Sequence, residues 1–312
     1  MIHLVRAVYG LEQFKVFVDS FRSTAPGTDY ELVLAMKGFA SSVDASSYLT
    51  LCKGIDAETV LLPDEGFDLD VYFELARRLQ RDRYCFLNSF SQILAPNWLA
   101  NLDSALQAPN VGLVGATGSW ASPKSWTLHR LRLPTPYRHI FPDRRHALDV
   151  LRTIRSEQTG QASPSLMRRS PKVTSRVRGI FEQIMYKESF PAPHIRTNAF
   201  MIRGIELSQM HFNRIRNKAD TYRIEHGRRS LTKQVSALGL KTLVVDRFGT
   251  TYEPEQWPSS NTYAHRNQEG LMVSDNQTTL YQDGDRARRS VLGRMAWGIE
   301  PEMDPSPRGC RT

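Results

Sequence analysis

The sequence predicts an α/β fold with a mainly parallel central sheet flanked by helices. Three observations predict it: short apolar segments of strand length, segments with helical spacing between them, and Gly or Pro at the junctions. Strands that alternate with helices at this spacing form parallel sheets with right-handed crossovers. The 312 residues, 40% of them hydrophobic, are enough for one large domain or two closely joined lobes.

The expected elements follow one another along the first half of the chain and resume after residue 187. Turn residues such as Tyr9-Gly10, Pro26-Gly27 and Pro63 separate them. Strands are expected at residues 2–8, 30–36, 59–62, 84–87, 111–116, 198–202 and 242–245. Helices are expected at residues 11–22, 47–52, 68–81, 98–107 and 229–238, where apolar side chains recur at helical spacing.

Basic residues are concentrated in one segment. The whole chain has a net charge of +9, and the thirteen Lys and Arg and four Asp and Glu of Leu128–Lys187 give that segment the same net charge. Five prolines interrupt it, and helices are expected at residues 146–157 and 173–186. Three interpretations stay open: a solvated loop, a surface for an anionic membrane, or a nucleic-acid site. Aromatic and basic residues are not interleaved there, so nucleic acid is the least favoured partner.

The sequence lacks the motifs of several common classes of enzyme, of disulfide-rich and zinc proteins, and of membrane-spanning proteins. The sequence has no Walker loop, no GxGxxG after the first strand, no HExxH and no GxSxG. Cys52, Cys85 and Cys310 fit neither a disulfide framework nor paired zinc ligands. No window resembles a secretory signal or approaches the ~20 apolar residues of a membrane span. We therefore expect a cytoplasmic protein, with peripheral association at the inner membrane face as a variant of that location.

Four stretches together resemble a known family. They are DEGFD with the helix and YCFLNS that follow, NWLANLDSALQAPNVGLVGA, HIRTNAFMIRG, and ADTYRIEHGRRSLTKQVSALGLKTLVV. This order is similar to that of the GT-A glycosyltransferases of family 2, over Ile2–Gly118 and His194–Tyr252. The resemblance implies a GT-A-like fold and transfer of a sugar, of hexosyltransferase type, from a nucleotide-sugar to a glycan or lipid-linked acceptor, as in polysaccharide biosynthesis. The alternative is a non-catalytic module of this fold that binds a glycan or a partner.

The resemblance also divides the chain. Residues 1–127 are expected to form the nucleotide-sugar (donor) half, and residues 188–285 the acceptor and catalytic half. Residues 128–187 would be a basic helical and loop insertion on the acceptor side or facing a membrane. Residues 286–312 are expected to be a C-terminal tail that is partly disordered, because the end of the chain is charged and rich in Pro.

Ligands of open α/β sheets bind outside the carboxyl ends of the strands. We therefore expect the donor to contact Arg6, Lys37, Asp68, Asn88 and Ser91, although Asp68 could instead cap its helix. The metal-binding Asp-x-Asp of the family falls on Asn88-Ser89-Phe90, which is a weak site for Mg²⁺ or Mn²⁺. Asn88, Asp275 and His265 are the weak metal candidates. Without a tightly held metal, Arg6 and Lys37 would have to stabilise the departing diphosphate.

The acidic motif of the family falls on Glu225, next to His226. An inverting transfer needs a general base for the acceptor hydroxyl, so the resemblance makes these the catalytic candidates. The alternative is that Glu225 caps the helix that follows. Acceptor-binding candidates are Arg196, Asn198, Trp257 and Asp275, with Tyr263 beside them. Their alternatives are an ion pair for the arginine, core packing for the aromatic residues and a turn for Asp275.

Overall fold

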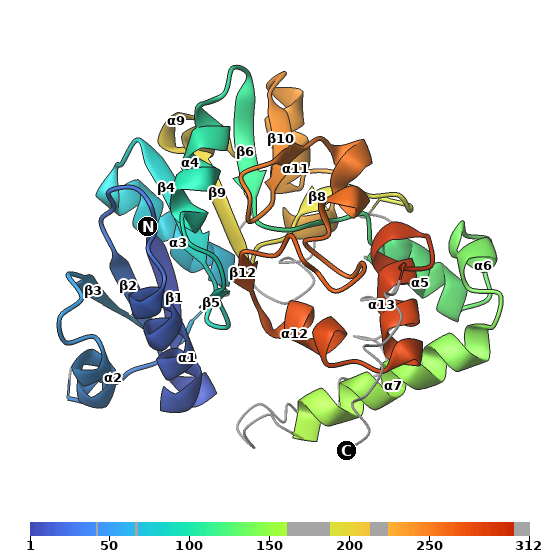
Figure 1. The fold of residues 1–312 in the computed structure, drawn as a ribbon, viewed down its shortest axis with the longest axis horizontal. Coiled ribbons are helices and arrows are strands. Elements are labelled where there is room, and N and C mark those ends of the chain that lie inside the picture. Colours follow the sequence, from blue (N-terminus) through green and yellow to red (C-terminus); the bar gives the residue numbers. More distant parts are fainter. Residues whose placement is uncertain (42, 66–67, 161–187, 213–223, 303–312) are drawn as a thin grey trace, which may run out of the picture.

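The computed structural model describes residues 1–41, 43–65, 68–160, 188–212 and 224–302. Its centre is an eight-stranded sheet in the order β11-β10-β6-β9-β4-β1-β2-β3 (Figure 1). The strands are β1 (Ile2–Arg6), β2 (Val33–Lys37), β3 (Glu58–Leu62), β4 (Arg83–Leu87), β6 (Val111–Gly115), β9 (Ala199–Arg203), β10 (Lys241–Val245) and β11 (Thr251–Tyr252). Each strand expected from the sequence is present, with ends that differ by a few residues.

The sheet is mainly parallel, as expected. Strand β1 pairs in parallel with both β2 and β4, β2 pairs in parallel with β3, and β10 pairs in parallel with β6. Strand β9 is antiparallel to both of its neighbours, β4 and β6, and β11 is antiparallel to β10. Because β9 comes from the second half of the chain and lies between two strands of the first, residues 1–127 and 188–285 share one sheet.

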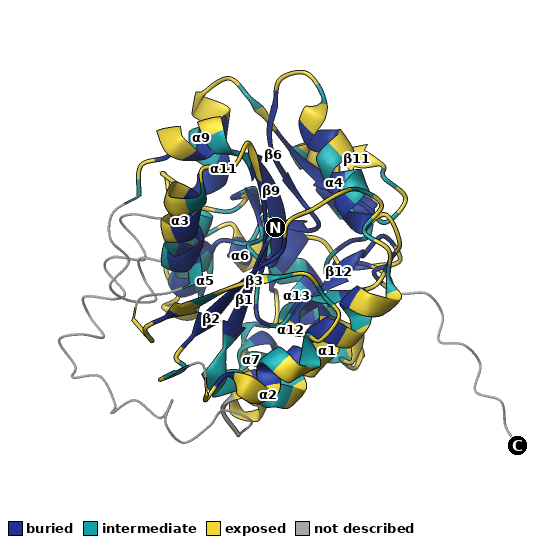
Figure 2. Ribbon diagram, turned by 90° about the vertical axis from the view of Figure 1, so that its left-hand side faces the viewer, coloured by how far each residue is buried: buried dark blue, intermediate teal, exposed yellow. Residues whose placement is uncertain are grey.

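Two hydrophobic cores lie on opposite faces of the sheet, because successive side chains of a strand point to opposite sides. Leu4 belongs to one core and Val5 to the other. The core with Val5 includes α1 (Gly10–Ser23), α2 (Ser46–Leu51) and α4 (Trp98–Gln107). The core with Leu4 includes α3 (Asp68–Leu79), α9 (Gly204–Gln209), α11 (Leu231–Ala237) and the 3₁₀ segment η3 (Pro254–Ser260). Figure 2 shows the buried strands between helices whose outer faces are exposed.

Two small antiparallel sheets lie beyond the central one. Strand β5 (Gln92–Ile93) pairs with β12 (Val273–Ser274), and β7 (Gly118–Ser119) pairs with β8 (His194–Ile195). Helix α12 (Asn276–Gln282) follows β12 directly, and the 3₁₀ segment η1 (Ala7–Tyr9) follows β1. These pairings bring segments that are far apart in the sequence to the ends of β4, β6 and β9.

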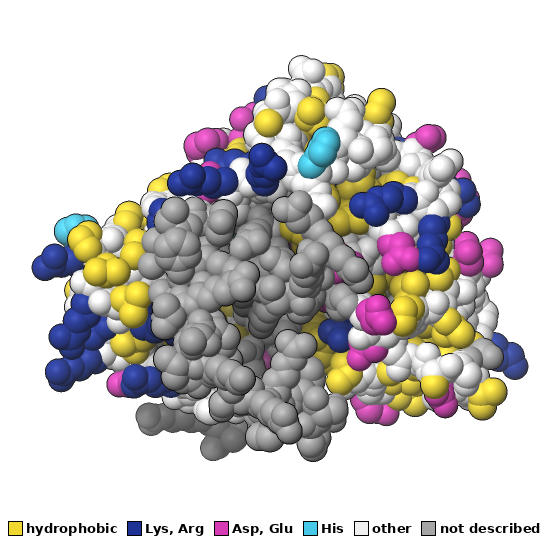
Figure 3. Space-filling view, turned by 180° about the vertical axis from the view of Figure 1, so that it is seen from behind, with side chains coloured by type: hydrophobic (Ala, Val, Ile, Leu, Met, Phe, Trp, Pro, Cys, Tyr) yellow, Lys and Arg dark blue, Asp and Glu magenta, His cyan; other side chains and the backbone are white. Residues whose placement is uncertain are grey.

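The first part of the basic segment forms helices and packs against the end of the chain. Helices α5 (Pro123–Arg130), α6 (Tyr137–Ile140) and α7 (Arg144–Gly160) enclose a third core with α13 (Arg286–Trp297). Basic and hydrophobic side chains lie together over this unit, at the left-hand edge of Figure 3. The helix expected at 146–157 is confirmed as α7, whereas the one expected at 173–186 lies outside the described residues. No described helix is long and apolar enough to cross a membrane.

The expectation of a tail from residue 286 is wrong for its first part. Residues 286–297 form α13, which Asp285 caps by accepting a hydrogen bond from the backbone N–H of Arg288. Trp297 is 1% exposed, and its indole N–H donates to the carbonyl of Tyr263. Burial of this large aromatic side chain fixes the helix to the domain, which the charged composition of the segment concealed. Residues 303–312 lie outside the described part of the chain.

Candidate functional site

The candidate site lies at the carboxyl ends of the parallel strands. Leu87, the last residue of β4, pairs with Ala199, and Gly115, the last residue of β6, pairs with Phe200. The loop before β9 therefore lies at the same edge of the sheet as the loops that follow β1, β2, β4 and β6. Open α/β sheets bind their ligands at this edge, and most of the candidate residues lie in these loops.

The first group of charged residues is the β1–β2 cluster: Arg6, Lys37, Asp64 and Asp68. The guanidinium of Arg6 lies 3.3 Å from Asp64 Oδ1 and 3.8 Å from Asp68 Oδ1. The carboxylate side chains remain 58% and 39% exposed. Lys37 is 1% exposed. Its pKa is lowered, first by burial and then by the positive charge of Arg6, although the negative charges of Asp68 and Asp64 act to raise it. Two cations are thus held together beside carboxylates that solvent can reach.

Aromatic side chains extend this cluster toward β4. The guanidinium carbon of Arg6 lies 5.3 Å from the ring centre of Tyr9, and the Tyr9 ring lies 4.5 Å from that of Phe90. The side chain of Phe90 cannot bind a metal, but it joins the loop after β4 to the loop after β1. Sequence reasoning singled out neither Tyr9 nor Asp64, although both lie in loops that it named. Tyr9 lies three residues after Arg6 along the chain, whereas the position of Asp64 next to Arg6 depends on the strand order, which the chain order alone does not give.

Asn88 and Ser91 close a turn rather than present free groups. Asn88 Oδ1 accepts hydrogen bonds from the backbone N–H of Phe90 (2.9 Å) and from Ser91 Oγ (3.2 Å). Ser91 is fully buried, and its hydroxyl also lies 3.1 Å from the carbonyl oxygen of Asn198. Asn88 N–H donates to that same carbonyl. Both residues therefore connect the end of β4 to the start of β9, and their side chains shape the loop that carries Phe90.

The three metal candidates do not form a hard-cation site. The side-chain oxygen of Asn88 already accepts two hydrogen bonds. Asp275 is committed to an arginine and to a helix end, and His265 Nδ1 lies 2.8 Å from Asn261 Oδ1. Among the described residues, no group of three or more His, Cys, Asp or Glu side chains could hold a metal ion. Mg²⁺ and Mn²⁺ prefer carboxylate, carbonyl and water oxygens, so these residues do not fit such an ion.

The second group is the β9–α12 network: Thr117, Arg196, Asn198, Tyr263 and Asp275. The guanidinium of Arg196 donates to Asp275 Oδ2 (2.9 Å) and to Thr117 Oγ1 (3.2 Å) and lies 3.9 Å from the ring centre of Tyr263. The side chains of the ion pair are 12% and 4% exposed. Asp275 Oδ1 also accepts from the backbone of Gln277 and Thr278, so the residue caps α12. Buried ion pairs persist when further hydrogen bonds satisfy them.

Asn198 belongs to the same network and is 2% exposed. Its side-chain oxygen accepts from Thr117 Oγ1 at 2.6 Å, and its amide donates to the carbonyl of Val273 at 3.3 Å. The side chain thus ties the segment after β6 to β12. Arg196 thus forms the ion pair that was its alternative, Asp275 caps α12, and Asn198 is hydrogen-bonded inside the protein.

Glu225 lies beside this network. Its Oε1 accepts from Thr197 Oγ1 at 2.5 Å, and its Oε2 lies 3.7 Å from His226 Nε2. The carboxylate side chain is 19% exposed. The His226 ring packs edge-on against that of His194, with ring centres 3.9 Å apart, and burial lowers the pKa of His194 to about 4. A carboxylate that is partly exposed and held by a hydroxyl can accept a proton from a ligand.

Two expectations about individual residues need correction. The capping alternative for Glu225 is wrong, because α11 begins at Leu231 and its cap is Ser230, whose hydroxyl accepts from the backbone N–H of Lys233. Trp257 is fully buried, and its indole N–H donates to the carbonyl of Tyr252 at 3.0 Å. Core packing therefore describes Trp257, and its ring is not available to stack on a sugar. Its place in η3 against β7 and β10 could not be read from the surrounding Pro and Ser residues.

Tyr72 connects the two groups. It is buried, and its hydroxyl donates to the carbonyl of Leu87 at 2.9 Å. Its pKa is raised well above its usual value, first by burial and then by nearby negative charges that include Asp68 and Glu225. Burial lowers the pKa of Arg196, but Asp275, Tyr263 and Glu225 raise it, so the pKa as a whole is raised. Asp68 from the first group and Glu225, which lies beside the second, therefore both raise the pKa of the same buried phenol.

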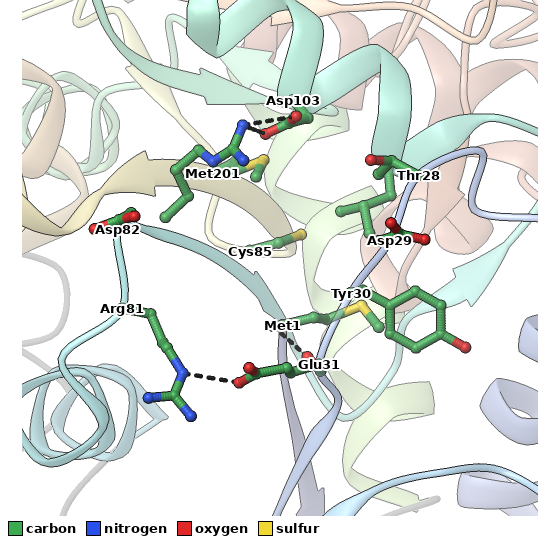
Figure 4. Close-up of a pocket in the computed structure, with 12 residues that line it drawn as sticks. Met1, Thr28, Asp29, Tyr30, Glu31, Arg81, Asp82, Cys85, Asp103 and Met201 are labelled. Carbon is green, nitrogen blue, oxygen red and sulfur yellow. Dashed lines mark hydrogen bonds and ion pairs between the residues drawn. The ribbon is translucent and has the colours of Figure 1, made fainter.

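Two cavities lie away from this edge. One of about 200 Å³ lies at the opposite ends of the strands, and its charged residues pair with one another, as Arg81 does with Glu31 (Figure 4). Another, of about 640 Å³, lies between α3 and α9. Beneath the β1–β2 cluster is a small cavity of about 10 Å³, lined in part by His3, Arg6 and Ser89. The candidate site rests on the convergence of side chains, not on a deep pocket among the described residues.

Comparisons with known proteins give distant likenesses. No family model matches the sequence, and no curated protein matches it. The solved mannosyltransferase PcManGT of Pyrobaculum calidifontis, in complex with GDP-Man and Mn²⁺, is 16% identical over 42% of this chain and 46% of its own, with a TM-score of 0.32. The glucosyl-3-phosphoglycerate synthase of Mycobacterium tuberculosis, in complex with Mn²⁺, UDP and phosphoglyceric acid, is 11% identical over 71% of this chain and 63% of its own, with a TM-score of 0.36.

A 4-diphosphocytidyl-2C-methyl-D-erythritol synthase of Anaerococcus prevotii is 10% identical over 78% of this chain and 87% of its own, with a TM-score of 0.38. This chain thus spans less than two thirds of the length of the mannosyltransferase and the glucosyl synthase. TM-scores below 0.5 at such identities leave family and function open, so the case for a function rests on the residues of this chain.

Proposed function

We propose that the chain is a glycosyltransferase that moves a sugar from a nucleotide-sugar donor to a hydroxyl group of a glycan or lipid-linked acceptor. The observation that carries the proposal is that two buried or half-buried cations, Arg6 and Lys37, and the partly exposed carboxylate of Glu225 lie at the same edge of the sheet. Transfer from a nucleoside diphosphate needs both: positive charge where the diphosphate departs, and a base where the acceptor loses its proton.

The donor would bind at the β1–β2 cluster. Arg6 contacts Asp64 and Asp68 at 3.3 and 3.8 Å, longer than the 2.7–2.9 Å of strong charge-assisted hydrogen bonds. A phosphate that approached Arg6 and Lys37 could therefore exchange with these carboxylates, or with water around them, at small cost. Tyr9 and Phe90 offer aromatic surface for the base or the sugar beside the cations.

The acceptor would approach from the side of Glu225. In the proposed step the acceptor oxygen forms a bond to the anomeric carbon while the bond from that carbon to the diphosphate oxygen breaks. The proton of the acceptor hydroxyl passes to the Glu225 carboxylate, and the electron pair leaves with the diphosphate. Thr197 holds the carboxylate through its hydrogen bond, and Arg6 and Lys37 stabilise the charge that develops on the leaving group.

A donor screen tests the first part of the proposal. Nucleotide sugars that carry UDP, GDP, CMP or dTDP are added singly to the protein, and the unfolding temperature is measured. A ligand that binds the folded state alone raises it, by an amount that grows with the logarithm of its concentration above Kd. Failure of all of these donors, with and without Mn²⁺, contradicts a nucleotide-sugar enzyme.

The variant Glu225→Gln tests the base. Its carboxamide keeps the size and can still accept from Thr197, but it cannot take up the proton. We expect turnover with the donor found above to fall about 10²- to 10⁴-fold, with donor Kd unchanged. The matched control is Glu253→Gln, an exposed carboxylate paired with Lys241. Equal turnover in the two variants would show that another group acts as base.

The second candidate function is a non-catalytic module that binds a glycan or a partner. It is favoured by Asn88, which by the resemblance to family 2 would stand at the position of a metal-binding carboxylate, and which closes its own turn. Donor binding without transfer or hydrolysis, in EDTA and in Mn²⁺ alike, would support the module and overturn the enzyme. Transfer that persists in EDTA would support the enzyme with Arg6 and Lys37 in the place of a metal.

A further inference from the structure

The end of α5 carries a small exposed tip in which basic and apolar side chains alternate: Arg130, Leu131, Arg132 and Leu133. All four residues are exposed, and Leu131 and Leu133 expose 41% and 46% of their surface. The tip belongs to the basic segment but is independent of the candidate site, and neither the fold nor the proposed transfer explains it. We call it the arginine–leucine tip.

Backbone hydrogen bonds fix the shape of this tip. Leu133 N–H donates to the carbonyl of Leu128, and Arg132 N–H donates to that of His129. This pattern is the Schellman motif, in which the residue after the helix adopts the left-handed region. Arg132 does so, with φ +62°. Arg144 adds a hydrogen bond of 2.8 Å to the carbonyl of Arg130. The tip therefore presents its side chains in a set geometry rather than as a frayed helix end.

The identity of the residue at the left-handed position is informative. Glycine is the usual residue there, because a Cβ atom disfavours this conformation. Arg132 occupies it and is exposed, and it has no carboxylate partner among the described residues. A residue in a disfavoured conformation, whose charge has no carboxylate partner in the described part of the chain, points to a contact outside the chain.

The charge around the tip is uncompensated. Residues 124–145 contain six Lys and Arg and a single acidic residue, Asp143, whose carboxylate accepts from the backbone N–H of His146. Within the described residues, neither Arg130 nor Arg138 forms an ion pair. The basic and hydrophobic side chains over α5, α6 and the start of α7 lie side by side at the left-hand edge of Figure 3. The surface thus combines positive charge with exposed leucines.

We propose that the arginine–leucine tip docks on the surface of a bilayer that contains anionic lipids. Arginines contact the lipid phosphates, while Leu131 and Leu133 enter the boundary between headgroups and acyl chains. A nucleic acid would use the arginines but would gain nothing from two exposed leucines, since phosphate contacts supply its non-specific affinity. The mixed surface therefore favours a membrane. The proposal does not rest on the proposed transferase activity, because vesicle binding is measured without turnover.

Sedimentation with vesicles tests the proposal. The full chain is mixed with vesicles of phosphatidylcholine alone, or with about 30 mol% phosphatidylglycerol, and binding to the second kind alone is expected. One Arg near an anionic surface contributes about fivefold to partitioning, so the triple variant R130Q/R132Q/R138Q should bind about 100-fold more weakly. The double variant L131S/L133S keeps the charge and should lose about tenfold.

The matched control removes the same charge elsewhere. Lys15, Lys53 and Lys241 are exposed residues of α1, the loop after α2 and β10, and K15Q/K53Q/K241Q should change binding by less than about threefold. Unfolding temperatures of all variants show whether they are folded. Equal losses in the control and the R130Q/R132Q/R138Q variant would overturn the proposal. So would binding to duplex DNA that is tighter than vesicle binding and indifferent to L131S/L133S.

Discussion

The two charged groups at the carboxyl edge of the sheet differ in how firmly their charges are paired. In the β1–β2 cluster, Arg6 meets its carboxylates at 3.3 and 3.8 Å, and those carboxylates are 58% and 39% exposed. In the β9–α12 network, Arg196 meets Asp275 at 2.9 Å, and neither side chain is more than 12% exposed. Asp275 also accepts hydrogen bonds from the backbone N–H groups of Gln277 and Thr278 at the start of α12. Arginine and aspartate thus form loosely paired, partly exposed ion pairs in the β1–β2 cluster and a tightly paired, buried ion pair in the β9–α12 network.

The difference teaches which charged residues can serve a ligand. A charge that is loosely paired and partly hydrated can exchange its partners at small cost, whereas removing a partner from a buried pair leaves an uncompensated charge. Arg6 therefore remains a donor-binding proposal, and Lys37, which is buried beside it, is proposed together with Arg6. Arg196 and Asp275 are better described as structural residues, whose ion pair holds in place the segment with Thr197, the partner of Glu225.

The largest expected effect is on stability, from Asp275→Ala. The change leaves Arg196 buried without its partner and removes the cap of α12, so we expect a loss of about 3–5 kcal/mol in the free energy of unfolding. Urea denaturation measures it. The control Asp103→Ala removes a carboxylate whose partner, Arg83, is 43% exposed and can be hydrated. Its loss should be at most about 1 kcal/mol, and equal losses would contradict the account of Arg196 and Asp275 as a buried pair that depends on its internal partners.

A second prediction concerns acid. Burial lowers the pKa of His3, on the strand of Arg6, to about 3, and that of His194, which packs against His226, to about 4, from the usual 6.5. Below pH 6.5 the unfolded chain therefore binds protons that the folded chain does not. Stability should fall by about 1.4 kcal/mol per pH unit and per histidine as the pH drops from 6.5, until about pH 4 for His194 and about pH 3 for His3.

Single variants separate the two contributions. His3 stacks on Phe17 with ring centres 3.5 Å apart, and both of its ring nitrogens lack a hydrogen-bond partner among the described residues. His3→Phe should therefore be tolerated. It should remove the contribution of one histidine, about 1.4 kcal/mol per pH unit, from the pH dependence of the free energy of unfolding. His194→Phe loses a hydrogen bond of 2.8 Å to the carbonyl of Ala192 but should flatten the slope equally. Urea denaturation at pH 7, 6 and 5 is the measurement. An unchanged slope in both variants would contradict this account.

The smallest effect on stability, but a clear one on binding, is expected from Arg6→Gln. Loss of this cation should raise the Kd of UDP or GDP about tenfold, because a charge-assisted contact to the diphosphate is removed. The free energy of unfolding should change by less than about 1 kcal/mol. Isothermal titration calorimetry gives Kd. A control, Arg22→Gln, removes an exposed arginine that contacts the carbonyls of Leu51 and Lys53. If Arg6→Gln lowers the free energy of unfolding by clearly more than about 1 kcal/mol while Kd is unchanged, the cluster is structural.

Sequence reasoning succeeded where a local pattern is sufficient. Apolar runs such as those of β4 and β6 must be buried, and the spacing of Phe14, Val18 and Phe21 identifies α1 without any knowledge of its neighbours. It failed at α13, whose basic residues concealed Trp297, and it left Trp257, whose surroundings contain Pro and Ser, open between sugar stacking and core packing. In both cases burial is decided by partners far along the chain.

The sequence by itself determined the α/β class, the alternation of strands and helices, the location of the basic segment, and the loops in which ligand-binding residues must be sought. Only the tertiary structure decided which residues meet. The insertion of β9 between β4 and β6 brings Arg196 to Thr117 and Asp275, and the order of β1 and β2 brings Lys37 to Arg6. Periodicity follows from the local geometry of the backbone, whereas the pairing of charges depends on strand order and burial, which distant segments settle together.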